Sequence, residues 1–384
     1  MPNPTDTQVA SGRRTTPPFR ADHVGSLLRP RRLLDAREDL AKGSITAPEL
    51  RTIEDEEITK LVQMQRDVGL QSATDGELRR GSWHMDFIYQ LGGIDKIQGD
   101  IEVHFRNADG TVDFKPAAIA VNQKVSLDHT IFEEDFRFLQ GAAGDGVTPK
   151  LTIPSPNMVH YRSGRAALNP DVYPDIEPFW ADLQAAYAQQ IAAVAALGCE
   201  YLQLDDTSLA YLNDPAQRAY LSDRGEDTAH LHETYVRNIN NALAGRPEGL
   251  TITTHLCRGN FRSSWAAEGG YEYVAETLFG QLDVDGFFLE YDDERSGGFE
   301  PLRFVPPGKM VVLGLVTTKR PQLESKDDLR RRIEEASQYV PLEQLCLSPQ
   351  CGFSSTLEGN ALTYDDQKAK LELVVQTAAE VWGS

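Results

Sequence analysis

The segment KMVVLGLVTTKRPQLESKDDLRRRIEEASQYVPLEQLCLSPQ, residues 309–350, decides the fold class. It begins with an apolar run at 310–316, continues through an amphipathic stretch at 325–339 and ends in a second apolar run at 345–348. Short apolar runs are typical of buried strands, and an amphipathic stretch between them is typical of a helix that packs on a sheet. The segment therefore predicts a strand, a helix and a second, parallel strand, which together form the repeating unit of α/β folds.

The same alternation extends over most of the chain. Apolar runs predict eight strands, at 20–24, 71–74, 150–153, 201–204, 251–254, 286–289, 310–316 and 345–348. Amphipathic stretches predict helices at 48–70, 176–197, 229–243, 325–339 and 364–382. Because eight such units close a barrel, we expect a (β/α)8 TIM barrel.

Two segments fall outside this pattern. Residues 1–18 are polar and rich in Pro and Thr, so we expect a disordered tail. Residues 97–128 alternate apolar and polar positions around Asp109-Gly110, which predicts a β-hairpin inserted between strands 2 and 3. A barrel with insertions can reach this length as one domain, so we expect residues 19–384 to form a single domain.

Composition excludes several classes of partner. The formal net charge of -20 disfavours nucleic acid and anionic membranes, because both attract basic proteins. No apolar run approaches the roughly 20 residues that span a bilayer, and the first residues have no apolar core of the signal-peptide kind. Four cysteines in 384 residues do not suggest a disulfide framework. We expect a cytoplasmic protein.

Polar residues follow the predicted strands at the end where barrels carry their chemistry. His255 and Cys257 follow strand five, Glu290 ends strand six and Cys351 follows strand eight. Side chains two residues apart on an extended segment point to the same side, so His255 and Cys257 can share one ion. The four donors suit tetrahedral zinc. The alternative is that the cysteines are core residues, which is the interpretation we favour for Cys199 and Cys346.

Two carboxylates lie at other strand ends. Glu77 follows strand two and Asp205 ends strand four, where they could bind a substrate ammonium group. The alternative is a salt bridge inside the barrel, for which Arg79 or Arg80 would serve. Gly25-Ser26 could offer backbone N–H groups to a carboxylate.

Six segments resemble the cobalamin-independent methionine synthase family, specifically its carboxyl-terminal catalytic barrel and its short single-domain relatives. These segments are HVGSLLRP (23–30), TDGELRR (74–80), QLDD (203–206), THLC (254–257), FFLEY (287–291) and SPQCGF (348–353). The resemblance implies a zinc-dependent enzyme of methionine biosynthesis that methylates the thiol of homocysteine. It implies that His255, Cys257, Glu290 and Cys351 are catalytic zinc ligands, and that Gly25, Ser26, Glu77 and Asp205 bind homocysteine.

The sequence departs from the family at strand seven. There the full-length enzymes carry an Asp-x-His-Ser-Pro element with the proposed proton donor, whereas this chain reads Thr317-Thr318-Lys319. An amine donor such as methyltetrahydrofolate needs that proton, but methylcobalamin does not, so both donors stay open. His84 or His104 could supply an acid from a loop. The residues expected on the donor side are Trp83, His160 and Tyr161.

Other functions stay open on the sequence alone. The same zinc chemistry would support alkyl transfer to another thiol, such as coenzyme M in the opening of an epoxide. A non-catalytic zinc-binding protein would explain the metal residues but gives no reason for Glu77 and Asp205. A metal-free decarboxylase of a tetrapyrrole would leave the four metal residues unexplained.

Overall fold

Seven parallel strands form the central sheet of the computed structural model. The structure describes all residues except 1–11, 98–102, 108–109, 115–117, 162–163 and 384. The sheet order is β1-β6-β7-β8-β9-β10-β11, so most neighbours in the sheet are also consecutive in the chain. These strands are β1 (Ser72–Ala73), β6 (Thr148–Pro154), β7 (Tyr201–Asp206), β8 (Thr251–Leu256), β9 (Gly286–Glu290), β10 (Met310–Val316) and β11 (Leu345–Pro349). The α/β class with a parallel sheet is confirmed.

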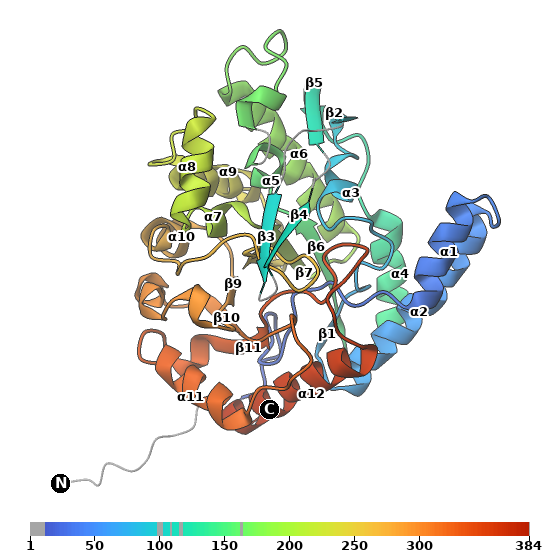
Figure 1. The fold of residues 1–384 in the computed structure, drawn as a ribbon, viewed down its shortest axis with the longest axis vertical. Helices are drawn as coiled ribbons and strands as arrows, with labels where there is room; N and C mark the ends of the chain where they lie inside the picture. Colours follow the sequence, from blue (N-terminus) through green and yellow to red (C-terminus); the bar gives the residue numbers. More distant parts are fainter. Residues whose placement is uncertain (1–11, 98–102, 108–109, 115–117, 162–163, 384) are drawn as a thin grey trace.

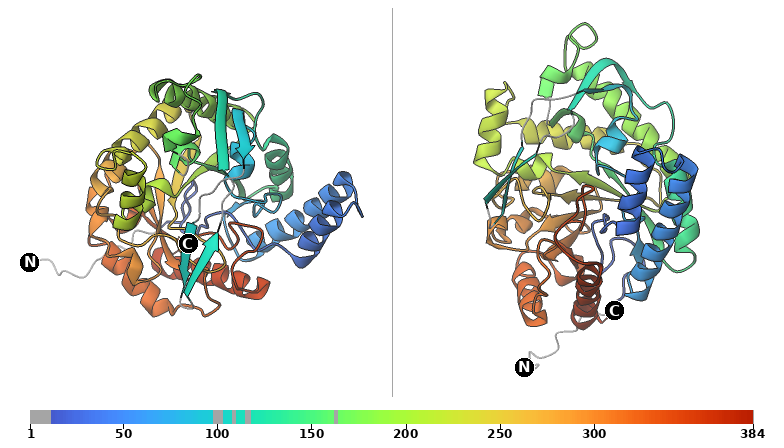
Figure 2. Two further views of the ribbon diagram at one scale, coloured as in Figure 1. Left: turned by 45° about the horizontal axis from the view of Figure 1, so that its top comes forward. Right: turned by 45° about the vertical axis from the view of Figure 1, so that its right-hand side comes forward.

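Helices surround the curled sheet, and the longer ones follow the chain order around its outside (Figures 1 and 2). They are α1 (Arg31–Ala41), α2 (Ala47–Asp67), α3 (Met85–Ile88), α4 (Glu133–Ala143), α5 (Asn157–Tyr161), α6 (Glu177–Ala196), α7 (Ser208–Tyr211), α8 (Pro215–Asp223), α9 (Leu231–Leu243), α10 (Ala275–Gln281), α11 (Lys326–Ala336) and α12 (Tyr364–Trp382). Capping boxes at Thr46/Glu49 and Thr363/Asp366 begin α2 and α12, because each pair satisfies backbone N–H groups that have no partner within the helix. All five helices expected from the sequence are present.

The segment expected as the first strand forms a single β-bridge. Ala21 pairs in parallel with Leu347 on β11, where the Leu347 amide donates to the Arg20 carbonyl at 2.8 Å. Toward the other edge of the sheet, the Leu27 amide donates to the Gly76 carbonyl at 3.0 Å, just beyond β1. Residues 20–27 therefore connect both edges of the sheet, although the regular ladder contains seven strands rather than the expected eight.

Asp22 holds this first segment inside the sheet. Its fully buried carboxylate accepts hydrogen bonds from the Phe19 amide at 3.0 Å and the Tyr201 hydroxyl at 2.9 Å. The Lys150 ammonium, also buried, lies 3.4 Å from the same carboxylate and 2.6 Å from the His23 carbonyl. A buried charge is stable only when it is paired and hydrogen-bonded, so these contacts fix the segment that leads to Gly25 and Ser26.

Two hydrophobic clusters fill the two sides of the sheet. The larger one packs the strands against the surrounding helices and contains Val311, Leu313 and Cys199. The smaller one contains Phe19, Val24, Tyr201, Phe288, Met310, Val312 and Cys346. Alternate residues of β10 belong to different clusters, as the period of two in a strand requires. Cys199 and Cys346 are thus core residues, as expected.

Two antiparallel strand pairs lie in the long connection between β1 and β6. Strand β2 (Gly92–Ile97) pairs with β5 (Ala118–Ser126), and β3 (Val103–Asn107) pairs with β4 (Gly110–Phe114). A single hairpin over residues 97–128 was expected, and its predicted turn at Asp109-Gly110 falls partly on residues outside the described ones. Arg106 on β3 exchanges two backbone hydrogen bonds with Trp265, which ties this pair to the loop after β8.

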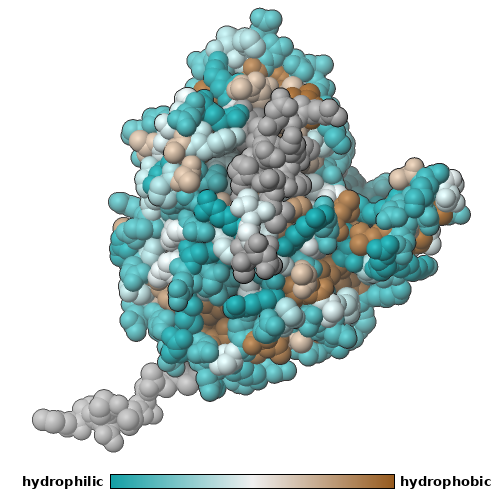
Figure 3. Space-filling model, viewed as in Figure 1, coloured by the Kyte–Doolittle hydropathy of each residue, from teal (hydrophilic) through white to brown (hydrophobic). Residues whose placement is uncertain are grey.

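The remaining surface features bear on partners. The face shown in Figure 3 is mainly hydrophilic, with small scattered hydrophobic patches. None of the helices in the described ranges is both long enough and apolar enough to cross a membrane.

The expected tail, residues 1–18, lies outside the described residues up to position 11. After that, the Gly12 amide donates to the Trp382 carbonyl at 3.4 Å and the Arg14 guanidinium donates to the Pro18 carbonyl at 2.7 Å.

Candidate metal centre

Four potential metal ligands meet at the carboxyl ends of three strands. His255 lies on β8, Cys257 follows it, Glu290 ends β9, and Cys351 lies two residues after β11. One donor atom from each side chain lies within 4.8 Å of every other, and all four residues are buried. The Cys257 and Cys351 sulfur atoms are 3.5 Å apart. The convergence expected from the strand ends is therefore present.

The geometry and chemistry of this group fit a zinc ion. Two sulfurs bound tetrahedrally at about 2.3 Å from zinc lie roughly 3.8 Å apart, close to the separation of Cys257 and Cys351. Both ring nitrogens of His255 are buried without a hydrogen-bond partner within the described part of the chain. Buried polar atoms without partners are rare, and a metal ion would satisfy one of them. One nitrogen, two sulfurs and one carboxylate oxygen form a donor set that zinc prefers.

The electrostatics of the group favour a cation. A hydrogen bond from Cys257, together with the nearby His255, lowers the pKa of Cys351 to about 5. The same thiol pair and burial raise the pKa of Cys257 well above its usual value. Burial would lower the pKa of His255, but interaction with Cys351 and the charges of Asp205 and Glu290 raise it instead. Protons thus occupy a negatively charged site, and a metal ion would replace them on binding.

Glu290 is held by residues that were not predicted from the sequence. The Arg258 amide donates to Oε1 at 2.9 Å, and the Arg295 guanidinium lies 3.3 Å from Oε2. The Tyr271 hydroxyl accepts a hydrogen bond from the Glu290 amide at 2.9 Å and another from Arg258 Nη1 at 3.1 Å. These contacts set the direction of the carboxylate. Arg258 follows Cys257 directly and Arg295 lies five residues after Glu290. The signal available in the sequence was therefore an arginine close to a candidate ligand.

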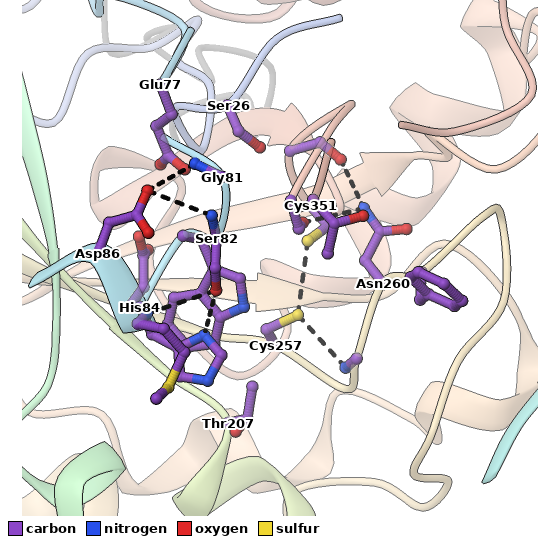
Figure 4. A pocket seen from close by; sticks show the side chains of 18 of the residues that line it. Ser26, Glu77, Gly81, Ser82, His84, Asp86, Thr207, Cys257, Asn260 and Cys351 are labelled. Carbon is purple, nitrogen blue, oxygen red and sulfur yellow. Dashed lines mark hydrogen bonds between the residues drawn. The ribbon is translucent and has the colours of Figure 1, made fainter. Parts of the chain in front are cut away.

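A cavity of about 350 Å³ opens beside the metal group (Figure 4). His255, Cys257 and Cys351 line it, whereas Glu290 does not. Three of the four residues expected to bind substrate line the same cavity, namely Ser26, Glu77 and Asp205. Gly25 lies behind them, and a Cβ atom there would be 2.7 Å from Thr152 Cγ2 and 3.6 Å from Glu77 Oε1. The two groups of residues predicted from the sequence therefore share one space.

Glu77 and Asp205 form a buried pair of carboxylates in this wall. Thr152 donates to Glu77 at 2.8 Å, and Gln203 donates to Asp205 at 2.6 Å. Burial, followed by repulsion from Glu77, raises the pKa of Asp205 to about 7. Burial also raises the pKa of Glu77. A cation placed between them would relieve both effects, because it favours the ionised forms.

The expected alternative for Glu77, an internal salt bridge, is also partly present. The Arg80 guanidinium lies 3.6 Å from Glu77 Oε1, while Arg79 instead pairs with Asp55 and Asp135. Glu77 also has a left-handed backbone, with φ of 57°, which is uncommon for a residue other than glycine. Strained residues of this kind cluster at functional sites, so the backbone favours a role beyond the salt bridge.

The loops after the first segment and after β11 pack closely beside Cys351. The Phe353 amide donates to the Ser26 carbonyl at 2.9 Å. A Cβ atom at position 352 would overlap the Ser26 hydroxyl, so this close approach requires Gly352. The contact places the cavity-lining Ser26 directly beside a candidate metal ligand.

The end of β10, which is the seventh strand predicted from the sequence, contributes no residue to the described cavity wall. The Thr318 hydroxyl donates to the Gly352 carbonyl at 3.1 Å, and the Lys319 ammonium lies 3.7 Å from Asp292. His84 and Trp83 do line the cavity. The side chain of His104 lies outside the described residues.

The expectation that His160 and Tyr161 line the donor side is wrong. Neither residue belongs to the cavity wall. His160 Nδ1 lies 3.1 Å from the Tyr235 hydroxyl and its ring packs on Trp180 at 4.8 Å, while the Tyr161 hydroxyl donates to Gln217 at 3.3 Å. Both are buried among helices outside the sheet, because α5 turns them away from the strand ends.

Comparisons with known proteins agree with this arrangement. Residues 176–380 match the family described as the catalytic domain of cobalamin-independent synthase. YxjG, an uncharacterized protein of Bacillus subtilis, is 48% identical over 380 residues, which cover 98% of each chain. Methionine synthase of Pyrococcus abyssi is 25% identical over 86% of this chain and 84% of its own. A solved structure from Listeria monocytogenes, provisionally assigned as a vitamin-B12-independent methionine synthase, is 41% identical with a TM-score of 0.78, over 97% of this chain and 100% of its own.

Proposed function

The chain belongs to the cobalamin-independent methionine synthase family, and from that premise we propose that it transfers a methyl group to the thiol of homocysteine and so forms methionine. One observation carries the proposal: three of the four candidate metal ligands, His255, Cys257 and Cys351, line the same cavity as the Glu77/Asp205 carboxylate pair. The first would hold zinc and the second suits an ammonium group, so together they match a substrate that is both a thiol and an amino acid.

Each side chain has a distinct role in this proposal. Glu77 and Asp205 bind the substrate ammonium group, and the Gly25-Ser26 backbone binds its carboxylate. When bound at the four ligands, zinc lowers the pKa of a coordinated thiol so that the sulfur is ionised at neutral pH. Arg258 and Arg295 keep the Glu290 carboxylate oriented. Fixing the substrate at both ends holds its sulfur in the attacking position, which removes much of the entropic barrier.

The carboxylate pair also separates this proposal from its rivals. Coenzyme M carries a sulfonate and no ammonium group, so Glu77 and Asp205 would repel it. A zinc-storage protein needs no buried carboxylates beside its metal. Both rivals therefore leave the pair unexplained, whereas homocysteine uses it.

We also propose the predicted domain extent, the closed barrel, the cytoplasmic location and the two candidate methyl donors. Residues 19–384 form one catalytic domain, and residues 20–24 act as the eighth strand of a (β/α)8 barrel, supported by their hydrogen bonds to β11 and to the loop after β1. All four cysteines are free thiols, which suits the reducing cytoplasm. The methyl donor is methyltetrahydrofolate or methylcobalamin.

The experiment that tests this function uses zinc-loaded full-length protein. It is incubated with homocysteine or coenzyme M and with each methyl donor in turn, and methionine and methylated coenzyme M are quantified. We expect methionine only. Zinc binding without turnover of either thiol would support the storage protein, and turnover of coenzyme M would support the other alkyltransferase.

The variant Asp205→Asn tests the ammonium contact. A hydrogen bond to a charged group contributes about 1.5–3 kcal/mol, so the KM for homocysteine should rise by roughly 10- to 100-fold. The exposed Asp171→Asn serves as the control and should leave KM unchanged. A KM within twofold of the unmodified protein would argue against Asp205 as an ammonium ligand.

A further inference from the structure

The cavity has a second, aromatic side beyond the metal ligands and the carboxylate pair. Trp83, His84 and Tyr89 come from the connection after β1, while Phe105 on β3 and Phe261 in the loop after β8 complete this part of the wall. The Trp83 and His84 rings lie 4.3 Å apart, and the Phe105 and Phe261 rings 5.4 Å apart. This side provides apolar ring faces that would contact the part of the methyl donor that bears the methyl group.

The size of the cavity limits what can enter it. Ligand sites for drug-sized molecules range from about 300 to 1,000 Å³, and this cavity of about 350 Å³ lies near the lower bound. Homocysteine must occupy part of the same space. A corrinoid ring with its side chains is larger than a drug-sized molecule, so it would have to remain outside. A donor that enters must present a ring system much smaller than a corrin.

His84 is held in a fixed orientation within this wall. Its Nδ1 atom lies 3.2 Å from the Ser82 hydroxyl, which also accepts a hydrogen bond from the Met85 amide at 3.4 Å. The Asp86 carboxylate accepts hydrogen bonds from the Gly81 amide at 2.5 Å and the Ser82 amide at 3.4 Å, and so fixes the turn. Figure 4 shows Ser82, His84 and Asp86 across the cavity from Cys257 and Cys351.

A methyl group on a tertiary amine leaves readily only when the nitrogen is protonated, so such a donor needs an acid in the cavity. Among the described residues of the wall, Glu77 and Asp205 are assigned to the ammonium group and His255 to the metal. An imidazolium is a suitable acid near neutral pH, whereas a lysine such as Lys96 holds its proton too tightly. The charged groups in the wall around His84 are Glu77, Asp86, Lys96, Asp205 and Glu358.

We propose that His84 is the catalytic acid of this protein and protonates the nitrogen of an amine methyl donor. The inference rests on the proposed methyl transfer. In the step, the homocysteine sulfur forms a bond to the methyl carbon while the carbon–nitrogen bond breaks. The electron pair of that bond goes to nitrogen, which takes the proton from the His84 imidazolium. Neutral His84 then regains a proton from water. A cobalt-bound methyl group would need no such acid.

The test compares donors in single-turnover reactions of zinc-loaded full-length protein. His84→Gln should slow transfer from methyltetrahydrofolate by roughly 10²- to 10⁴-fold, the usual contribution of a general acid. It should leave homocysteine affinity, measured by calorimetry, within threefold of the unmodified protein, because His84 does not bind that substrate. The matched control His129→Gln changes an exposed histidine bonded to Gln90 and should have no effect.

Rescue by added imidazole distinguishes proton donation by His84 from a structural role. His84→Ala is assayed with and without added imidazole, and recovery of the methyltetrahydrofolate rate supports proton donation, whereas no recovery contradicts it. A His84→Gln rate within threefold of the unmodified protein also overturns the role. Activity of the unmodified protein with methylcobalamin but not methyltetrahydrofolate overturns it while leaving the proposed function intact. Transfer from neither donor, with homocysteine bound, overturns both.

Discussion

Replacing Cys351 with serine should weaken zinc binding far more than the same replacement at Cys346. Cys351 would supply one of the four ligands of the proposed site, and structural zinc sites bind with about 10–16 kcal/mol, so one ligand would contribute on the order of 3–4 kcal/mol. Since 1.4 kcal/mol is a tenfold change, the zinc Kd of Cys351→Ser should rise by roughly 10²- to 10³-fold. The serine hydroxyl cannot replace the thiolate, because it stays protonated and does not pair with Cys257 in the same way.

Cys346 is the matched control for this prediction. It precedes Cys351 by five residues and is fully buried, but it belongs to the smaller hydrophobic cluster. Cys346→Ser should therefore keep full zinc affinity and instead lose about 1–3 kcal/mol of folding stability from the buried hydroxyl.

The assay is a competition titration of each metal-free variant with zinc and a chromophoric chelator, with circular dichroism and thermal unfolding as checks of folding. A folded Cys351→Ser protein whose zinc Kd lies within threefold of the unmodified value would refute the four-ligand site. Equal loss of zinc from both variants would show that the effect is general destabilisation.

Three further variants test the surroundings of the site and the helical layer. Tyr271→Phe leaves the Glu290 amide without its 2.9 Å acceptor and should weaken zinc binding by about 10- to 100-fold in the same titration. Gly352→Ala forces a Cβ atom onto Ser26 and should lower the unfolding free energy by about 1–3 kcal/mol, measured by urea titration. Burial lowers the pKa of His160 to about 4, so stability should fall as the pH drops from 6.5 to 4. His160→Gln should remove about 3 kcal/mol of that pH-dependent loss, and an unchanged pH profile would contradict the burial.

The sequence predicted the parts of the fold that repeat along the chain. The run at 310–316 matches β10 residue for residue, because a strand buried on both faces is apolar throughout. The rule that barrel chemistry lies at strand ends then brought His255, Cys257, Glu290 and Cys351 together from three separate regions. Both inferences needed only local pattern and the order of the strands.

Features set by contacts between distant residues were not predictable in the same way. Arg20, Asp22 and His23 make the first segment polar, yet all three are buried. The partners that stabilise the buried Asp22, such as Lys150 and Tyr201, lie more than a hundred positions away in the chain, so local pattern could not predict the burial. Helix α1 was missed because only Leu33 and Ala36 of its residues are buried, which leaves a weak periodic pattern.

The residues around the site show the same limit. The hydrogen bond that the Arg258 amide donates to Glu290 spans 32 positions, and the one that the Glu290 amide donates to Tyr271 spans 19, so no local spacing in the chain predicts them. His160 and Tyr161 follow a strand as the rule requires, but the direction of the short helix α5 decides where their rings lie. Strand order predicts which loops meet, and side-chain direction within a loop needs the structure.

The contact between Ser26 and the loop at Gly352 also bears on how the protein is made. The two residues that meet there are 326 positions apart, so a chain emerging from the ribosome exposes its first loop long before the partner loop exists. The candidate metal ligands are likewise separated in the chain, since Cys351 is synthesised 94 residues after Cys257. A nascent chain can therefore offer an incoming ion at most three of its four donors until Cys351 has been synthesised. Binding of the proposed metal would consequently follow the synthesis of Cys351 and would be coupled to the joining of the loops at Ser26 and Gly352.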